Sequence, residues 1–210
     1  RHLWTDGLSF DYKGQRARID GEFKNLPAWL AGLPVYIKAN ARVSIGNFFP
    51  TEFVPDTAST KSQNRIAFRL PDGFEFDISL NIDNLDFKKF SASNIKGNLI
   101  YKPGLLSFKS FNLNSMDGLI SGDFLLAREI GKSFISRGSF TLGEIDIKKA
   151  FSSFNNFGQD FIKAENLAGS LSGKISILMP LDSLLNPKTK AITAEGKYNV
   201  TNGALINFEP

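Results

Sequence analysis

A strict alternation of apolar and polar residues is the feature that most constrains the fold of this chain. Between residues 74 and 83 every second residue is large and apolar, and each residue between them is polar. Successive side chains of a β-strand point to opposite faces, so this pattern predicts a strand with one apolar and one polar face. The apolar positions are Phe74, Phe76, Ile78, Leu80 and Ile82.

The same alternation recurs along most of the chain and predicts an all-β protein. Paired residues that tolerate positive φ separate many of these segments, as hairpin turns require, so neighbouring strands should be mostly antiparallel. These pairs are Asp6-Gly7, Lys13-Gly14, Asp72-Gly73, Pro103-Gly104, Asp117-Gly118 and Asn202-Gly203. The other predicted strands are 8–12, 16–23, 35–45, 65–70, 97–101, 105–113, 118–127, 134–142, 167–179, 191–200 and 204–208.

Glycines occur inside several predicted strands, on the apolar side. Interior glycine weakens a strand, so its recurrence indicates either tight bending or a close approach from the apolar side, although glycines also occur in ordinary strands. We therefore expect an elongated, strongly curled antiparallel sheet that forms an apolar groove. The glycines are Gly21, Gly122, Gly138, Gly169, Gly173 and Gly196.

One short unit of sequence is used twice. The segment 85–89 followed by Asn94-Ile95-Lys96-Gly97 reappears as 145–149 followed by Asn166-Leu167-Ala168-Gly169. A repeated β-unit cannot bury its own apolar face, so it stacks on its neighbours and forms an extended array. We expect residues 1–210 to form a single elongated β-groove, a fragment of a longer protein, with repeat-like units near 85–144 and 145–210.

An amphipathic helix is predicted from Lys148 to Ile162, within the extra residues of the second repeat. Asp146 is a suitable N-cap, and apolar residues recur at helical spacing. We expect this helix to cap the groove with Phe151, Phe154, Phe157 and Phe161. Weaker helical turns are predicted near 26–31 and 181–185, and a loop is predicted from 46 to 63.

Composition excludes several function classes. The chain has no cysteine, and its one histidine is His2, so thiol chemistry, a Ser-His-Asp triad and a multi-histidine metal site are not available. Carboxylate pairs such as Asp83 and Asp86 are expected on strand rims. We therefore predict no catalytic residue, no metal, no cofactor and no enzyme activity. The net charge of +4 arises from interspersed charges, which argues against a nucleic-acid partner.

Phenylalanine dominates the aromatic residues, with 20 Phe against 4 Tyr and 2 Trp. Phe has no polar group, so it suits a purely apolar surface, although any single Phe more often fills a β core. We expect the groove to be lined by the apolar positions of several strands. The predicted lining residues are Phe74, Phe76, Ile78, Leu80, Ile82, Phe108, Phe124, Phe140, Leu171, Ile175 and Ile177.

Three segments resemble the C-terminal region of AsmA-like proteins, particularly those of Bacteroidetes: 151–162, 166–171 and 202–210. The likeness is clearest over 85–210. It implies a taco-shaped β-groove of the bridge-like lipid-transfer class, located in the periplasm and anchored in the inner membrane by an N-terminal helix. This chain has no such helix and ends where the family adds further strands, so anchoring and completeness of the groove rest on the resemblance.

The leading hypothesis is a periplasmic lipid-binding module that shields acyl chains and guides phospholipid between the inner and outer membranes. Its partner would be a phospholipid or another acyl lipid. Two alternatives remain: a structural periplasmic scaffold acting in outer-membrane assembly, and a carbohydrate-binding β-domain. Sugar binding favours exposed Trp and Tyr, which this chain under-supplies.

Overall fold

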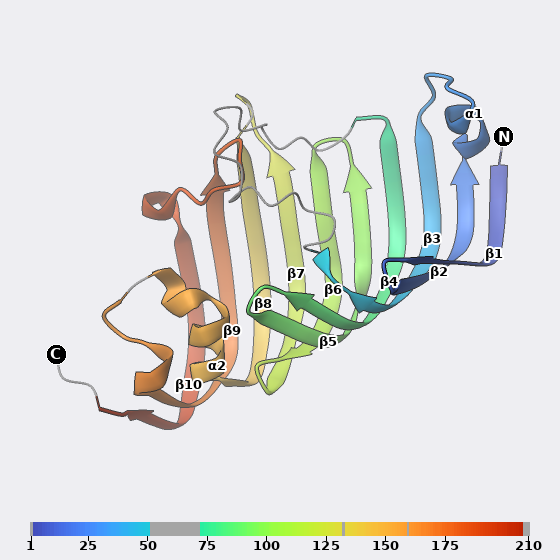
Figure 1. Ribbon diagram of the computed structural model, residues 1–210. Coiled ribbons are helices and arrows are strands. Elements are labelled where there is room, and N and C mark those ends of the chain that lie inside the picture. Colours follow the sequence, from blue (N-terminus) through green and yellow to red (C-terminus); the bar gives the residue numbers. More distant parts are fainter. Residues whose placement is uncertain (1, 51–71, 132, 159, 208–210) are drawn as a thin grey trace.

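The computed structural model describes residues 2–50, 72–131, 133–158 and 160–207. They form one ten-stranded sheet in which the spatial order of the strands is their order in the chain. Figure 1 shows the strands side by side from β1 to β10, with the two chain ends at opposite ends of the sheet. The strands are β1 (His2–Tyr12), β2 (Gln15–Lys24), β3 (Ile37–Phe48), β4 (Phe74–Phe87), β5 (Phe90–Lys102), β6 (Leu105–Ser115), β7 (Gly118–Arg128), β8 (Phe134–Asp146), β9 (Leu167–Leu181) and β10 (Thr193–Leu205).

Neighbouring strands are antiparallel except for β3 and β4, which are parallel. The all-β fold and the mostly antiparallel pairing are therefore confirmed. Within the described residues, β1 and β10 each pair on one side only, so the sheet is open. The sheet is not strongly curled, and the expectation of a strongly curled sheet is wrong.

Most predicted strands match observed ones, which are often longer, but the strands predicted separately at 191–200 and 204–208 are wrong as a pair, because a single strand, β10, runs from Thr193 to Leu205. Two of the predicted turn pairs, Lys13-Gly14 and Pro103-Gly104, connect adjacent antiparallel strands, and the turn predicted at Asp117-Gly118 lies one residue earlier, at Met116-Asp117. The predicted turns at Asp6-Gly7 and Asn202-Gly203 are wrong, because the strand register shifts there without a reversal of the chain. The predicted strand 65–70 and most of the loop 46–63 lie outside the described residues.

Irregularities within the strands are β-bulges at residues with positive φ. Register shifts occur beside Asn94 in β5, Ser110 in β6 and Glu144 in β8, which have φ values of 52°, 48° and 57°. A bulge bends and twists its strand locally, while the strand keeps its apolar side chains on one face beyond the bulge.

Helical segments are few. The turn predicted near 26–31 is the short helix α1 (Leu26–Leu30), whereas the turn predicted near 181–185 is wrong. There the Asp182 carboxylate accepts hydrogen bonds from the backbone N–H groups of Leu184 and Asn186, and these fix a non-helical loop. The connection between β8 and β9 contains α2 (Ile147–Ser153), η2 (Asn155–Gly158) and η3 (Ala164–Asn166), and η4 (Thr189–Ala191) precedes β10.

The protein exposes far more surface than a compact chain of its size. Its accessible surface is 14128 Å², whereas a compact protein of 23.2 kDa exposes about 9,700 Å². A single layer of sheet contributes to this exposure, because a second layer normally buries the apolar face of such a sheet. The apolar face of the sheet is therefore the surface most available for binding.

Candidate functional site

One row of residues crosses the apolar face from edge to edge. Residues that pair directly across neighbouring strands lie on the same face, so the register alone defines the row. It begins at Thr5 in β1 and ends at Ala194 in β10. Between them lie Gly21, Ala41, Ile78, Leu99, Phe108, Phe124, Gly138 and Ile177, each the partner of the one before it. We call these ten residues the central row.

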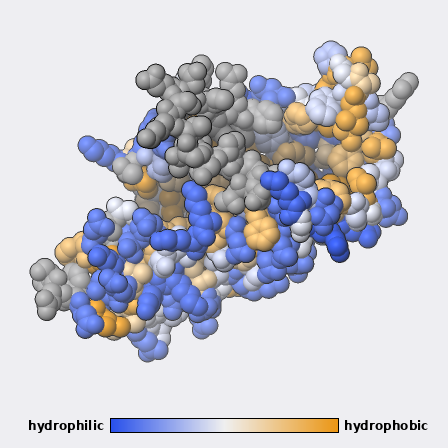
Figure 2. All heavy atoms as spheres, in the orientation of Figure 1, coloured by the Kyte–Doolittle hydropathy of each residue, from blue (hydrophilic) through white to orange (hydrophobic). Residues whose placement is uncertain are grey.

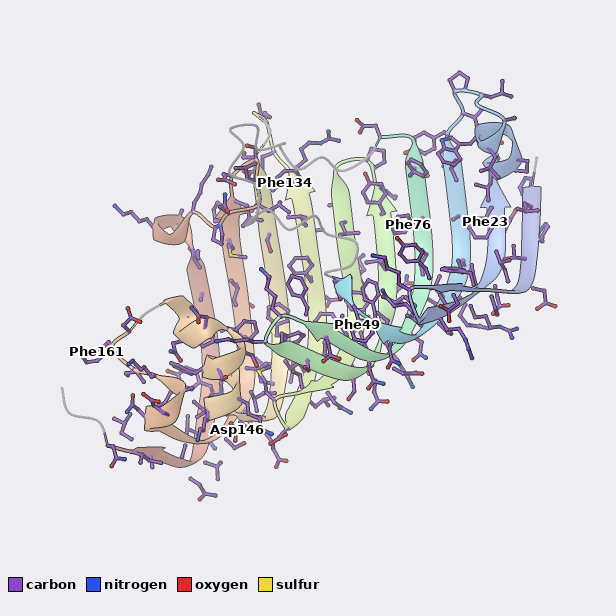
Figure 3. The ribbon with its side chains drawn as sticks, viewed as in Figure 1. Phe23, Phe49, Phe76, Phe134, Asp146 and Phe161 are labelled. Atoms are coloured by element: carbon purple, nitrogen blue, oxygen red, sulfur yellow. The ribbon has the colours of Figure 1, made fainter. Side chains whose placement is uncertain are left out.

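All of the predicted lining residues lie on the face that carries the central row. Ile82 is buried, with 4% of its surface exposed, and the others are half-buried. Direct pairing joins several of them across strands, as between Phe108 and Phe124 or between Phe140 and Ile175. In Figure 3, Phe23, Phe76 and Phe134 extend from one side of the sheet. Alternation therefore placed these side chains on a common face.

Two parts of this face are filled by the chain's own side chains. One cluster surrounds Tyr101, Leu126, Phe134 and Leu181, with Phe134 only 1% exposed. The other surrounds Ile82, Ala92 and Ile95. We call them the Phe134 cluster and the Ile82 cluster. Ile78, Leu99 and Ile177 of the central row belong to neither cluster and stay half-buried, so the row forms an apolar strip that is incompletely covered at these positions.

Aromatic rings lie over two of the strand glycines. A Cβ atom added to Gly97 would lie 2.7 Å from the ring of Phe108 and 2.8 Å from Cβ of Phe111, and one added to Gly138 would overlap the ring of Phe140. The Phe108 and Phe111 rings themselves stack with centroids 5.0 Å apart. These two glycines therefore make room for rings on the apolar face, and at Gly138 a close approach, not a bend, explains the glycine.

Sequence reasoning missed several residues of this face, including Tyr101, Phe111 and Phe134. Phe108 and Phe111 are three positions apart, so alternation puts them on opposite faces, but the bulge at Ser110 returns Phe111 to the apolar face. No feature of the sequence marks that bulge. Phe134 is the first residue of the predicted strand 134–142, and Tyr101 is the last residue of the predicted strand 97–101. Extending the alternation to these strand ends would have identified both.

The predicted cap helix is shorter than expected. Asp146 is the N-cap, and its carboxylate accepts a hydrogen bond of 2.7 Å from the Lys149 backbone N–H. The helix α2 ends at Ser153, because Asn155, Asn156 and Phe157 adopt left-handed φ values of 51° to 53°. A helix from Lys148 to Ile162 is therefore wrong. Figure 1 shows α2 in front of the C-terminal end of the sheet, where it contacts β8 and β9.

The four phenylalanines of this segment differ in exposure. Phe151 is half-buried, whereas Phe154, Phe157 and Phe161 are 48%, 61% and 68% exposed. The Phe154 ring lies 5.9 Å from that of Phe90, which packs against the Ile82 cluster. The segment thus sits at the rim of the apolar face, while most of its aromatic surface faces outward.

The opposite face of the sheet is polar and carries exposed ion pairs. Lys38 Nζ lies 2.6 Å from Glu75 Oε2, which lowers the pKa of Glu75 and raises that of Lys38. A separate pocket of about 900 Å³ is lined by residues from the ends of β3, β4, β6 and β8 and from the starts of β5 and β7. Its lining is mostly polar and includes Asn47, Asn84, Asp86, Ser91, Ser93 and Asn114.

The described part of the chain contains no group of three or more His, Cys, Asp or Glu residues that could hold a metal ion. Among the same residues, no helix is both long and apolar enough to cross a membrane. Comparison with known proteins found no matching family, no matching curated protein and no matching solved structure. Arguments about function therefore rest on the two faces of the sheet.

Proposed function

We propose that this protein is a lipid-binding module whose apolar face shields acyl chains. The observation that carries the proposal is the central row, in which Ile78, Leu99 and Ile177 are half-buried and belong to neither filled cluster. Covering apolar surface is worth roughly 25 cal/mol per Å², so this strip favours an apolar ligand. A chain-like ligand fits a strip that runs across many strands better than it fits an enclosed pocket.

Side-chain chemistry supports an acyl chain over a polar ligand. The aromatic residues of the row are phenylalanines, and the row contains only one side chain with a hydrogen-bonding group, Thr5 at its edge. A polar ligand would lose hydrogen bonds to water on this surface without replacing them. The resemblance to AsmA-like proteins favours the same ligand class, a periplasmic location and movement of phospholipid between the two membranes.

The test compares Ile78→Asp with Ser79→Asp. Ile78 is half-buried in the central row, and Ser79 is the next residue of β4, exposed on the polar face. A carboxylate at 78 should repel acyl chains, whereas one at 79 should have no effect on them. Organic extraction of each purified protein, followed by lipid mass spectrometry, should show lipid in the wild type and Ser79→Asp and a loss in Ile78→Asp. Lipid retained equally by both folded variants would contradict the proposal.

The mostly polar pocket at the ends of β3 to β8 supports a second candidate, binding of a glycan. Amide, hydroxyl and carboxylate groups such as those of Asn84, Ser93 and Asp86 can hydrogen-bond to sugar hydroxyls. Asn84 Nδ2 already donates to Asn47 Oδ1 at 3.1 Å, which orders part of the lining. Calorimetric titration with soluble oligosaccharides would test it, and heat that disappears in Asn84→Ala and persists in Ile78→Asp would favour this candidate.

A further inference from the structure

An exposed cluster of aromatic rings projects from the connection between β8 and β9. The Phe157 ring contacts the Phe154 ring at a centroid distance of 5.5 Å and the Phe151 ring at 5.1 Å. Phe154 and Phe157 are 48% and 61% exposed, and Phe161 of the same segment is 68% exposed. Figure 2 shows apolar side chains at this end of the molecule among hydrophilic ones, and Figure 3 shows Phe161 at its outer margin. Adjacent exposed rings of this kind typically mark a contact surface.

The backbone holds these rings outward at an energetic cost. Asn155, Asn156 and Phe157 have φ values of 51°, 51° and 53°, and Gly158 follows with 72°. Left-handed conformations are unfavourable for residues with a side chain, and a bulky residue such as Phe is rarely found there. Such strain persists where the surrounding structure fixes it, and it is concentrated at functional sites. The strained residue of this run is Phe157, since Asn and Gly adopt left-handed conformations more readily.

Cationic side chains lie beside the rings. Lys89 and Lys163 are exposed, and both line a small cavity of about 160 Å³ together with Ser152, Asn155 and Asn156. Within the described residues neither ammonium group has an ion-pair partner, whereas Lys149 is paired with Asp117 at 2.5 Å. The lining also includes Glu165, so two ammonium groups, one carboxylate and several hydrogen-bond donors line the cavity. These side chains suit a phosphate ligand better than a cationic ligand.

The exposed rings are continuous with the apolar face. Phe90 joins the two, because it packs against the Ile82 cluster and its ring lies 5.9 Å from Phe154. An apolar path therefore runs from the sheet to Phe157 at the surface. A bilayer is the partner that offers acyl chains to such a path and phosphates to the flanking lysines.

We propose that the segment from Phe151 to Lys163 docks on the surface of a phospholipid bilayer. Phe154, Phe157 and Phe161 enter the boundary between headgroups and acyl chains, while Lys89 and Lys163 contact lipid phosphates. This docking surface is distinct from the central row. It can bind a membrane whether or not the row carries lipid, so the two proposals fail separately.

Vesicle flotation tests the proposal. The probes are vesicles of phosphatidylcholine alone and of phosphatidylcholine mixed with phosphatidylglycerol. The wild type should float with both, more strongly with the mixed vesicles and less strongly at high salt. Phe154→Ser with Phe157→Ser should reduce the bound fraction at least about tenfold on both. Lys89→Glu with Lys163→Glu should remove the preference for the mixed vesicles and the sensitivity to salt.

Matched controls distinguish docking through this segment from nonspecific association with vesicles. Ile130 is fully exposed at the other end of the strands, and Lys174 is exposed on the polar face, so Ile130→Ser and Lys174→Glu should float like the wild type. Ile78→Asp should also float, because it alters the central row alone. Circular dichroism should show unchanged strand content in the Phe, Lys and Ile130 variants, since all of these residues are exposed.

Three results would overturn the proposal. The first is a wild type that does not float, and the second is undiminished flotation of the double Phe variant. The third is a dimer, detected by light scattering, that the double Phe variant abolishes without any change in flotation. That result would assign the rings to contact between copies of the chain.

Discussion

The Phe134 cluster and the middle of the central row lie on the same face of one sheet, but they differ in how well they are covered. Phe134 is 1% exposed and packs among Tyr101, Leu126 and Leu181, whereas Ile78 and Ile177 are half-buried and belong to no cluster. The same pattern of alternation produced both. Apolar residues on one face of a sheet can therefore form a core in one place and an available surface in another, depending on what lies above them.

The largest difference in stability between the two regions should appear when the Phe134 ring is removed. Phe134→Ala should lower the free energy of unfolding by about 3 to 5 kcal/mol, because a fully buried ring leaves a cavity. Phe157→Ala, with its ring 61% exposed, should cost less than about 1 kcal/mol. Urea denaturation followed by circular dichroism measures both. Equal losses in the two variants would show that burial does not distinguish these rings.

A smaller effect should come from the glycines beneath the rings. A methyl group at Gly138 overlaps the Phe140 ring, so Gly138→Ala should destabilise the protein by about 1 to 3 kcal/mol. Gly143 in the same strand is the matched control, since its added Cβ would meet nothing closer than 3.8 Å. If Gly138→Ala and Gly143→Ala unfold at the same urea concentration, the rings do not need that space. Phe140→Leu should partly rescue Gly138→Ala.

The smallest effect concerns the loop that helps to close the Phe134 cluster. Leu185 packs against that cluster, and the loop carrying it is ordered by Asp182, whose carboxylate accepts hydrogen bonds from Asn186 Nδ2 at 3.0 Å and from two backbone N–H groups. The side-chain hydrogen bond from Asn186 and the backbone hydrogen bonds lower the pKa of Asp182 below its usual value of 3.8. Its contribution to stability is therefore present above the unfolded-state pKa and is lost as the pH falls through the folded-state pKa.

Asp182→Asn provides the corresponding measurement. The variant should be slightly less stable than the wild type at pH 6, and this difference should shrink as the pH falls below about 4, where the carboxylate becomes protonated. Urea midpoints measured across this pH range give the result. A difference that stays constant with pH would show that the carboxylate charge has no part in holding the loop.

Much of the fold was accessible from the sequence because alternation reports directly on strand geometry. The β4 pattern from Phe74 to Ile82 was sufficient to identify both the strand and its apolar face. The bulges at Asp6-Gly7 and Asn202-Gly203 were not recognised, since the residues that permit a hairpin turn also permit a bulge. Local residue types do not specify whether the chain reverses there.

Only part of the candidate site could be predicted from the sequence, for a similar reason. Alternation assigns a face to Ile78 and Phe134 alike but does not say which of them other side chains will cover. The end of α2 depends on the left-handed residues from Asn155 to Phe157, although the apolar spacing continues to Ile162. Glycine at 138 indicated a close approach or a bend, and only the position of the neighbouring Phe140 ring distinguishes these two cases.

The most direct test of the central claim is photo-cross-linking from the two faces of one strand. Benzoylphenylalanine would replace either Phe108, in the central row, or Lys109, which is exposed on the polar face. After irradiation in the presence of phospholipid vesicles, mass spectrometry would identify the adducts. We predict covalent phospholipid adducts from position 108 and none from position 109. Equal labelling at both positions, or the absence of lipid adducts at 108, would contradict an apolar face that binds acyl chains.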